Sequence, residues 1–218
     1  MINPDDYEKE YVENVYNTIA DEFNNTRTYI WNRLKIFINN IIKNDDINLI
    51  EVGSGNGKNL NYIYNLNNNL KLFGIEKSIN LLNISKDNNK NINYQLGDNL
   101  NINFNDNTFD YTLSIAVIHH FSTLERRLKA IEELIRITKI NGIIFIQVWA
   151  FEQKFTKKKF NSQDQLIQWI GTNNININRY YYLFKKGELE ELVSKFNITI
   201  IESFEEHDNY GVIIKKTS

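Results

Sequence analysis

Short apolar runs alternate with helical patterns through the middle of the chain, and this alternation constrains the fold more than any other feature. The apolar runs cover residues 47–52, 70–76, 92–96, 109–117 and 143–149. Strands that alternate with helices pair in parallel and place helices on both faces of one sheet. The last run is almost continuously apolar, as expected for a strand buried on both faces. The pattern therefore predicts an α/β fold with a mostly parallel sheet.

Helical patterns precede the first predicted strand. Asn3-Pro4 is typical of a helix start, since Asn caps free N–H groups and Pro fits the first turn. Apolar side chains then recur every four residues, at Tyr11, Val15, Ile19 and Phe23. A second helix is expected from residue 31 to about 42. Because we find no repeat and no Pro/Gly/Ser-rich linker, we interpret residues 1–218 as a single domain with an N-terminal helical extension over about 1–45.

A helix and a hairpin complete the predicted fold. Ser122 is expected to cap a helix that Asn141-Gly142 ends before the strand at 143–149. Residues 198–201 and 212–214 have the pattern of two strands joined by a tight link at 208–211. Such a hairpin would close one edge of the sheet with antiparallel strands.

The composition excludes several classes of function. The chain has no cysteine, which excludes a disulfide framework, a cysteine zinc site and a cysteine nucleophile. With 25 basic and 27 acidic residues, the net charge of −2 by itself indicates neither a nucleic acid nor a membrane partner. No run of about 18 apolar residues is present, so a membrane-spanning helix is not expected. The polar, acidic N-terminus has no signal or transit pattern, which predicts a cytosolic or nuclear protein.

A glycine-rich loop follows the first predicted strand, where an α/β fold binds its ligands. The loop reads Glu51-Val52-Gly53-Ser54-Gly55-Asn56-Gly57. The glycines lie two apart, which is tighter than the G-x-G-x-x-G of dinucleotide loops. No Lys-Ser/Thr pair follows them, so a Walker phosphate loop is excluded. Taken alone, the loop could also be a plain turn between a strand and a helix.

Three acidic side chains give the loop a more specific meaning. Glu51 suits a ligand with a cationic end. Glu76 ends the second predicted strand, where a carboxylate can hold a ribose diol. Asp98 follows the third strand and is placed to reach an adenine edge. The loop and these acids together favour S-adenosylmethionine as the cofactor over the plain-turn interpretation.

A series of motifs along nearly the whole chain resembles one family. The motifs are Glu8-Lys9-Glu10-Tyr11-Val12, Thr26-Arg27, Glu51 to Lys58, Ser114 to Thr123 with Glu125-Arg126-Arg127, Trp149-Ala150, Glu152-Gln153, Arg179-Tyr180-Tyr181 and Gly187-Glu188-Leu189. They resemble the eukaryotic tRNA wobble-uridine carboxymethyl methyltransferases, which esterify 5-carboxymethyluridine at the anticodon. The resemblance implies a Rossmann-like class I methyltransferase fold, S-adenosylmethionine as cofactor and tRNA as substrate.

The resemblance also implies which side chains form the site. Arg27, His119 and Arg179 are the catalytic candidates, and no metal is implied. Cofactor contacts are implied at Glu51, Gly53, Ser54, Gly55, Gly57, Glu76, Asp98, Asn99 and Ile115. A carboxymethyl substrate is ionised at pH 7 and is a ready nucleophile, so no general base is required. It does need a cation to hold it, and the forked guanidinium of arginine suits a carboxylate.

Each catalytic candidate also has a structural interpretation. Arg27 could tie the N-terminal helices to the body, and Arg179 could form an ion pair at a strand edge. His119-His120 could suggest a metal pair, but without cysteine a zinc site is not expected, and one of the two could be structural.

Two clusters and one basic pair have open roles. The basic run at Lys154, Lys157, Lys158 and Lys159 could contact tRNA phosphates or form a solvated loop. Tyr180-Tyr181-Tyr182 could stack an anticodon base or belong to the core. Arg126-Arg127 begins a predicted helix and could be solvated.

The chain departs from the family pattern at several positions. Glu76 stands where Asp is usual, Tyr182 replaces a His, His207 replaces an Arg and Tyr210 replaces a Trp. The resemblance further implies a small zinc-binding activator protein, forming a heterodimer by extending the sheet at residues 92–96. Two other hypotheses remain: an S-adenosylmethionine-dependent enzyme for a small molecule, and a non-catalytic scaffold that binds the cofactor.

Overall fold

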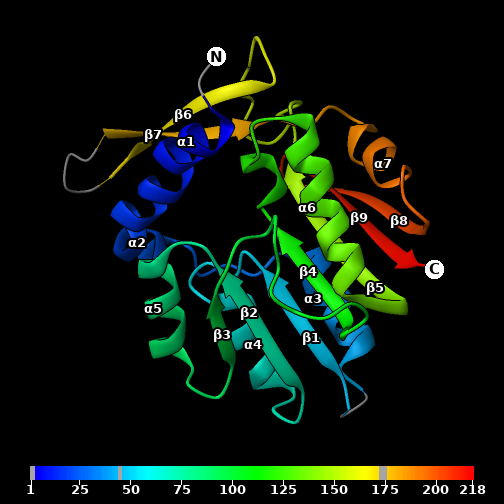
Figure 1. Ribbon diagram of the computed structural model, residues 1–218. Coiled ribbons are helices and arrows are strands. Elements are labelled where there is room, and N and C mark those ends of the chain that lie inside the picture. Colours follow the sequence, from blue (N-terminus) through cyan, green and yellow to red (C-terminus); the bar gives the residue numbers. More distant parts are fainter. Residues whose placement is uncertain (1–2, 44–45, 172–175) are drawn as a thin grey trace.

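Seven strands of the computed structural model form one sheet, in the order β3-β2-β1-β4-β5-β9-β8 (Figure 1). The structure describes residues 3–43, 46–171 and 176–218. The parallel strands are β1 (Asn48–Val52), β2 (Lys71–Glu76), β3 (Asn93–Leu96), β4 (Phe109–Ile115) and β5 (Thr138–Trp149). The strand order reverses between β1 and β4, which is where sheets of this kind bind ligands. The predicted α/β fold is confirmed.

Helices cover both faces of the sheet because successive strand side chains point to opposite sides. Leu49 of β1 packs in a cluster with α3 (Asn32–Ile41), α4 (Lys58–Leu66) and α5 (Ile79–Asn88). Ile50 packs on the other side with α6 (Leu124–Ile137) and α7 (Glu188–Val193). Both clusters consist of buried aliphatic and aromatic side chains, so the sheet lies between two apolar layers.

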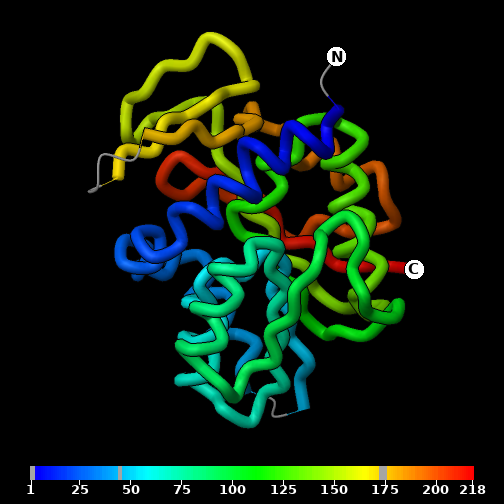
Figure 2. Tube along the Cα trace, turned by 60° about the vertical axis from the view of Figure 1, so that its left-hand side comes forward, coloured from blue at the N-terminus to red at the C-terminus, as the bar shows by residue number. Residues whose placement is uncertain are grey.

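The N-terminal segment runs as α1 (Pro4–Glu8), a π-helical turn η1 (Lys9–Glu13) and α2 (Asn14–Thr26). Asn3 caps α1 as expected, since its side chain accepts the N–H of Asp5 at 3.0 Å. The blue helices lie between α5 and the yellow hairpin in both views (Figures 1 and 2). Residues 1, 2, 44 and 45 of the expected extension lie outside the described residues.

The ends of α6 differ from the prediction. Thr123, not Ser122, is the N-cap, and its side chain accepts the N–H of Arg126. The helix ends at Ile137 rather than at Asn141-Gly142. The hydroxyl of Thr138 bonds Leu134 O at 2.6 Å and the Thr112 hydroxyl at 2.7 Å, which ties the first residue of β5 to both the helix and β4. Asn141 has φ +68°, and the pairing of β4 with β5 shifts register nearby, so the expected break is an irregularity inside the strand.

The antiparallel edge is confirmed. β8 (Ile198–Glu206) and β9 (Asn209–Lys216) form a hairpin, and β9 pairs antiparallel with β5. The link is tighter than expected, because only His207 and Asp208 separate the strands. Both have positive φ, +43° and +61°, as a two-residue turn between twisted strands requires.

A second sheet is absent from the sequence prediction. β6 (Asp164–Ile170) and β7 (Asn176–Tyr182) form a two-stranded antiparallel hairpin apart from the main sheet (Figure 1). Trp169 of β6 packs against Val15 and Ile19 of α2. Its indole N–H donates to the carboxylate of Glu22 at 3.0 Å. The hairpin is therefore attached to the N-terminal helices, and it carries Arg179 with it.

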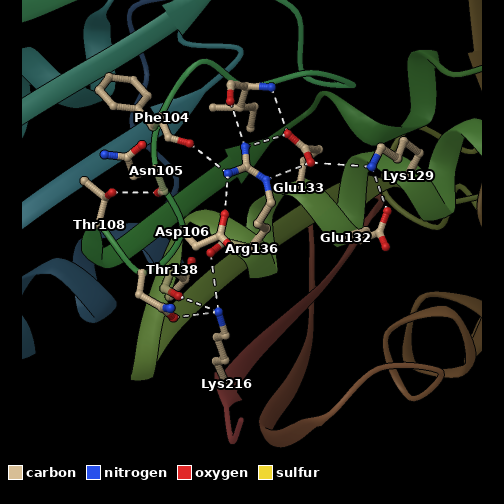
Figure 3. A network of polar contacts seen from close by, with 12 residues as sticks. Phe104, Asn105, Asp106, Thr108, Lys129, Glu132, Glu133, Arg136, Thr138 and Lys216 are labelled. Carbon is tan, nitrogen blue, oxygen red and sulfur yellow. Dashed lines mark hydrogen bonds and ion pairs between the residues drawn. The ribbon is translucent and has the colours of Figure 1, made fainter.

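A polar network fixes the loop that follows β3 (Figure 3). Arg136 of α6 donates to the carbonyl oxygens of Ile102 and Phe104 at 2.7 Å each, and to the carboxylates of Glu133 and Asp106. Glu133 in turn accepts the N–H of Ile102 at 2.8 Å. A guanidinium with this many partners holds a loop in one geometry. The same loop begins near Asp98, just after β3, so the network holds the second half of the segment that leads from β3 to β4.

Candidate active site

A pocket of about 490 Å³ lies over the carboxyl ends of β1, β2, β4 and β5. The N-terminal helices cover it, with Glu8, Tyr16 and Phe23 among the side chains that line it. The structure brings eleven of the twelve predicted site residues to its wall: Arg27, Glu51, Gly53, Ser54, Gly55, Glu76, Asp98, Asn99, Ile115, His119 and Arg179. A cavity of this size fits a nucleoside-containing ligand.

Gly57 is the predicted cofactor residue that does not line the pocket. It is the N-cap of α4 with φ +76°, and an added Cβ would meet the ring of Tyr94. Its role is to turn the chain from the loop into the helix in a crowded position. Gly53 has φ +78°, and a Cβ there would collide with Val117. Only glycine therefore allows the loop to pass this closely under the pocket.

Glu51 is the acid at the base of the pocket. It is 1% exposed, and Asn59 donates to its Oε1 at 2.6 Å. Its Oε2 is buried without a hydrogen-bond partner. Burial raises the pKa of Glu51 to about 8, against the opposing hydrogen bond from Asn59 and the charge of Lys58. A buried carboxyl with a free oxygen on a pocket wall is a site for a cationic group.

Glu76 is held on the wall by two backbone donors. Its Oε2 accepts the N–H of Gly55 at 2.7 Å, and its Oε1 accepts the N–H of Ser78 at 2.8 Å. Burial raises its pKa, and these hydrogen bonds oppose the rise. Each carboxylate oxygen accepts more than one hydrogen bond, so the group is still able to bind a diol.

Asp98 and Asn99 form the wall beyond Glu76. Asp98 accepts from Lys77 Nζ at 2.8 Å and from Leu100 N–H at 2.9 Å. Desolvation would raise the pKa of Asp98, but these donors and the Lys77 charge outweigh it, and the pKa lies below its usual value. Asn99 has a buried Oδ1 without a partner. An ionised carboxylate beside a free amide oxygen suits a ligand that offers N–H donors.

These residues fit S-adenosylmethionine. That cofactor carries an amino group and a sulfonium at one end, a ribose diol in the middle and an adenine at the other. The unpartnered oxygen of Glu51, the backbone-held carboxylate of Glu76 and the free oxygen of Asn99 lie on the pocket wall and suit these three parts respectively. The pairing follows the donor and acceptor chemistry of each group.

Two arginines meet over one tryptophan at the other side of the pocket. The guanidinium carbons of Arg27 and Arg179 lie 5.3 Å and 4.8 Å from the ring centroid of Trp169. Arg179 is 5% exposed, and its Nε is buried without a partner. Guanidinium groups stack on aromatic faces and keep their N–H edges for an anion. The pocket therefore has an acidic side and a cationic side.

The two histidines have different surroundings. Both ring nitrogens of His120 are engaged, since Nδ1 donates to Tyr180 O at 2.8 Å and Nε2 accepts from the Tyr16 hydroxyl at 3.0 Å. Burial lowers the pKa of His120 to about 3. His119 accepts the N–H of Trp149 at Nδ1, so its proton lies on Nε2. Burial, with the charges of His120 and Arg179, lowers its pKa well below the usual value. His119 is a neutral donor on the pocket wall, and His120 is structural.

The tyrosine cluster divides between the pocket and the packing around it. Tyr181 lines the pocket and stacks on Trp149, with ring centroids 4.4 Å apart and planes at 18°. Tyr180 and Tyr182 donate to the carboxylates of Asp164 and Glu188. Tyr180 and Tyr181 are buried, as the core interpretation predicts, and stacking on an anticodon base stays a prediction for Tyr181, the member that lines the pocket.

Arg126 is not solvated, contrary to one interpretation of the sequence. Its guanidinium donates to both oxygens of the buried Glu8 at 2.8–3.0 Å and forms an ion pair with Asp5 at 2.7 Å. Glu8 also accepts the N–H and hydroxyl of Ser122. These contacts fasten α1 to the body at the rim of the pocket. Arg127 is also buried, with its guanidinium 3.5 Å from the ring centroid of Tyr182.

Several residues in or beside the pocket were not identified from the sequence. Trp169 does not line the pocket but contacts Arg27 and Arg179, and it lies in a hairpin that the sequence pattern did not reveal. Tyr16 was not singled out from the sequence, although its hydroxyl lies 3.5 Å from Arg179 Nη1 and 3.0 Å from His120 Nε2. Lys58 follows the glycine loop and donates to the carbonyl of Tyr29 at 2.8 Å. Burial lowers the pKa of the Lys58 ammonium, and the charge of Glu51 opposes this shift.

Across residues 3–43, 46–171 and 176–218, no group of three His, Cys, Asp or Glu side chains has an arrangement that could hold a metal ion. Within the same described residues, no helix combines the length and the apolar character needed to cross a membrane.

Comparison with known proteins identifies a domain family and several relatives that are similar to this chain. The model of the methyltransferase domain family matches residues 50–146. The tRNA (carboxymethyluridine(34)-5-O)-methyltransferase of Schizosaccharomyces pombe is 34% identical, with 97% of this chain and 98% of that protein covered. The Xenopus tropicalis tRNA (carboxymethyluridine(34)-5-O)-methyltransferase alkbh8 is 30% identical over 96% of this chain, which spans 41% of that longer protein.

Solved structures agree on the fold. An S-adenosylmethionine-dependent methyltransferase from Clostridium acetobutylicum has a TM-score of 0.72 at 12% identity, over 94% of this chain and all of that one. A chain from a complex of the Haloferax volcanii Trm112 methyltransferase activator with a methyltransferase has a TM-score of 0.68 at 11% identity, over 95% of this chain and 99% of that one. Sequence, fold and pocket agree, and the chain belongs to the family of tRNA (carboxymethyluridine(34)-5-O)-methyltransferases.

Proposed function

We propose that the protein transfers the methyl group of S-adenosylmethionine to the carboxylate of 5-carboxymethyluridine at the wobble position of tRNA. The observation that supports this most directly is the polarity of the pocket. Glu51 and Glu76 form an acidic side that suits a cationic cofactor, and Arg27 with Arg179 forms a cationic side that suits a carboxylate. The names of the relatives supply the identity of the substrate.

Methyl transfer from a sulfonium to a carboxylate requires few catalytic groups from the protein. When bound, the cofactor supplies an electrophilic sulfonium methyl group. The substrate carboxylate is ionised near pH 7 and needs no base, so the remaining task is alignment and exclusion of water. The guanidinium edges of Arg27 and Arg179 orient the carboxylate, and the Nε2–H of His119 is a neutral donor for the uridine or its carboxylate. Because His119 is neutral, it adds no further positive charge beside the two arginines.

The function is tested by transfer of labelled methyl from S-adenosylmethionine to tRNA that carries unesterified carboxymethyluridine, with and without a small zinc-binding activator protein. Mild alkali then hydrolyses the product. Label that enters the tRNA and leaves as methanol supports an ester at the wobble base. Cofactor binding without incorporation, with the activator present, contradicts the tRNA assignment and favours a small-molecule substrate or a scaffold.

The proposed role of Arg179 is tested by a substitution with a matched control. Arg179→Gln removes the guanidinium and is expected to lower kcat/KM for tRNA by about 10- to 100-fold, as for loss of a charged hydrogen bond. Arg33→Gln removes an arginine whose partner is Glu202 and which does not line the pocket. It should keep the wild-type rate. Equal rates for the two variants contradict the proposed role of Arg179.

We also propose that a small zinc-binding activator pairs with β3, forming a heterodimer. β3 is one edge of the main sheet, with Leu96 59% exposed on it and Ile79 of the adjacent α5 45% exposed. An open edge with exposed apolar side chains is suited to strand addition by a partner. Co-elution of the two proteins on gel filtration tests this. Leu96→Asp should abolish co-elution, and Ile201→Asp on the opposite edge strand β8 should retain it.

A further inference from the structure

An exposed row of rings borders the pocket. Tyr29 and Trp31 precede α3, Phe155 follows β5, and His207 lies in the turn between β8 and β9. Neighbouring ring centroids are 5.9 Å apart for Tyr29 and Trp31, 6.1 Å for Trp31 and His207, and 4.8 Å for His207 and Phe155. Tyr29, Trp31 and His207 also line the pocket, so this aromatic rim is continuous with it.

The rim is both open and fixed. Phe155 is 69% exposed and Tyr29 is 50% exposed. The backbone N–H groups of Phe155 and Thr156 donate to the two carboxylate oxygens of Asp208 at 2.6 Å and 2.7 Å. These bonds hold the segment that carries Phe155 against the turn that carries His207. A single exposed apolar side chain is ordinary, but several rings in contact form a strip that suits a flat apolar ligand.

Cations follow the rim directly. Lys157, Lys158 and Lys159 are exposed, and none forms an ion pair with a carboxylate in the part of the chain that the structure describes. Lys158 also lines the pocket. Lys154 differs, since Glu205 neutralises it at 2.8 Å. The rings of the rim meet edge to face or tilted rather than stacked on one another. Free ammonium groups beside exposed rings are the combination that binds unpaired nucleic acid, because bases stack on the rings and phosphates pair with the lysines.

We propose that the aromatic rim stacks the unpaired nucleotides on either side of the target uridine, and that Lys157, Lys158 and Lys159 contact their phosphates. This inference rests on the proposed function and deepens it. A base that enters a pocket leaves its neighbours without their stacking partner. The rim replaces that partner, so the enzyme recognises the bases around the modified uridine by their flat faces and accepts any sequence there.

The test compares two anticodon stem-loop RNAs that carry carboxymethyluridine. One has natural bases beside the target, and the other has abasic sites there. The variant Phe155→Leu keeps an apolar side chain of similar size but removes the ring face, and Phe155→Tyr restores a ring. Ile140→Ala removes another exposed apolar side chain, 54% exposed, from the start of β5 at the far end of that strand. Wild-type cofactor affinity and thermal stability of each variant verify the fold. All reactions contain the activator.

Stacking of one base changes binding by about 5- to 150-fold, and an exposed ring belongs to the lower part of this range. We expect Phe155→Leu to lower kcat/KM for the natural stem-loop by about fivefold or more, and Phe155→Tyr and Ile140→Ala to match the wild type. On the abasic RNA, wild type and Phe155→Leu should have equal kcat/KM. The triple change of Lys157, Lys158 and Lys159 to Gln should reduce the slope of log Kd against log salt by about 0.7 for each lysine.

Two failures are distinguishable. If the wild type methylates the natural stem-loop and Phe155→Leu matches it, the rim does not stack bases and the inference is wrong. If the wild type methylates neither RNA, the proposed function is wrong, and the inference that rests on it is wrong as well.

Discussion

The buried acid at the base of the pocket predicts how cofactor binding depends on pH. The pKa of Glu51 is raised to about 8 because the carboxyl is 1% exposed. At pH 7 the empty site is therefore mostly protonated, and a cationic ligand must displace that proton. The free energy of ionising the group at pH 7 is about 1.4 kcal/mol, for the one pH unit that separates 7 from 8. Binding at pH 7 should release about 0.9 proton.

The variant Glu51→Gln removes this linkage while keeping the shape of the side chain. Loss of one partner from a buried charge pair costs about 3 kcal/mol or more. Subtracting the ionisation cost leaves about 1.6 kcal/mol at pH 7, or roughly tenfold weaker binding of S-adenosylmethionine. At pH 9 the carboxylate is already ionised, so the same variant should bind about 100-fold more weakly than the wild type.

Isothermal titration calorimetry from pH 6 to pH 9, in buffers of different ionisation enthalpy, measures both affinity and proton release. As pH rises from 6 to about 8, the wild-type Kd for S-adenosylmethionine should fall by up to tenfold per pH unit, and above pH 8 it should become constant. The Kd of Glu51→Gln should stay constant over the whole range. A wild-type Kd that does not change with pH, with no proton released, refutes the assignment of a neutral Glu51 in the empty site.

The same shift has an effect on stability whose sign is opposite to the usual carboxylate case. The folded-state pKa of Glu51 lies above its ordinary value of 4.5, so the folded chain holds the proton more tightly than the unfolded chain does. This contribution to stability is fully present below pH 4.5 and is lost as pH rises towards about 8, by up to about 1.4 kcal/mol per pH unit. Without cofactor, the wild type should therefore lose more stability than Glu51→Gln in thermal scans from pH 5 to pH 8.

Three further predictions concern packing around the pocket. Trp169→Leu removes the ring under both arginines and should raise KM for tRNA several-fold at unchanged cofactor affinity, whereas Trp169→Phe should recover most of the loss in steady-state assays. Gly53→Ala forces a positive φ and a clash with Val117, and should lower unfolding free energy by about 2–4 kcal/mol in urea titrations and weaken cofactor binding. Arg126→Ala removes the ion-pair partner of the buried Glu8, which keeps only its hydrogen bonds from Ser122, and should cost about 2 kcal/mol or more by the same measurement. Lys129→Ala breaks the exposed pair with Glu132 and a longer contact with Glu133, which keeps Arg136 as its partner, and should stay within about 0.5 kcal/mol. Equal losses for Arg126→Ala and Lys129→Ala contradict the proposed role of the Arg126–Glu8 pair.

Local pattern was enough to predict the main sheet and the acidic residues on the pocket wall. Strand periodicity and the G-x-G-x-G loop depend on residues close in sequence, and ligands of α/β folds gather at strand ends by topology alone. The positions of Glu51, Glu76 and Asp98 in the chain were therefore enough to predict that they line one pocket. Gly57 shows the limit, since spacing places it in the loop, and only packing against Tyr94 reveals that it turns the chain rather than lining the pocket.

The ends of helices and strands were harder to predict from the sequence, because they depend on partners elsewhere in the chain. Ser122 and Thr123 are equally good caps by sequence. Ser122 bonds Glu8, more than a hundred residues away, and leaves the cap to Thr123. Asn141-Gly142 is a typical sequence for the end of a helix. The strand nevertheless begins at Thr138, because the Thr138 hydroxyl forms a hydrogen bond with Thr112 on β4.

The sequence by itself determined the fold class, the family and the acidic residues of the pocket, since each depends on local pattern or on motifs that stay together in the chain. The motifs named Arg27 and Arg179 as candidates, but only the tertiary structure decided that their guanidinium groups lie together. Arg27 and Arg179 are 152 residues apart by their numbers, and the ring that joins them belongs to a hairpin whose pattern is weak. Their common position follows from the packing of Trp169 against α2, and such a long-range contact leaves no periodic signal in the sequence.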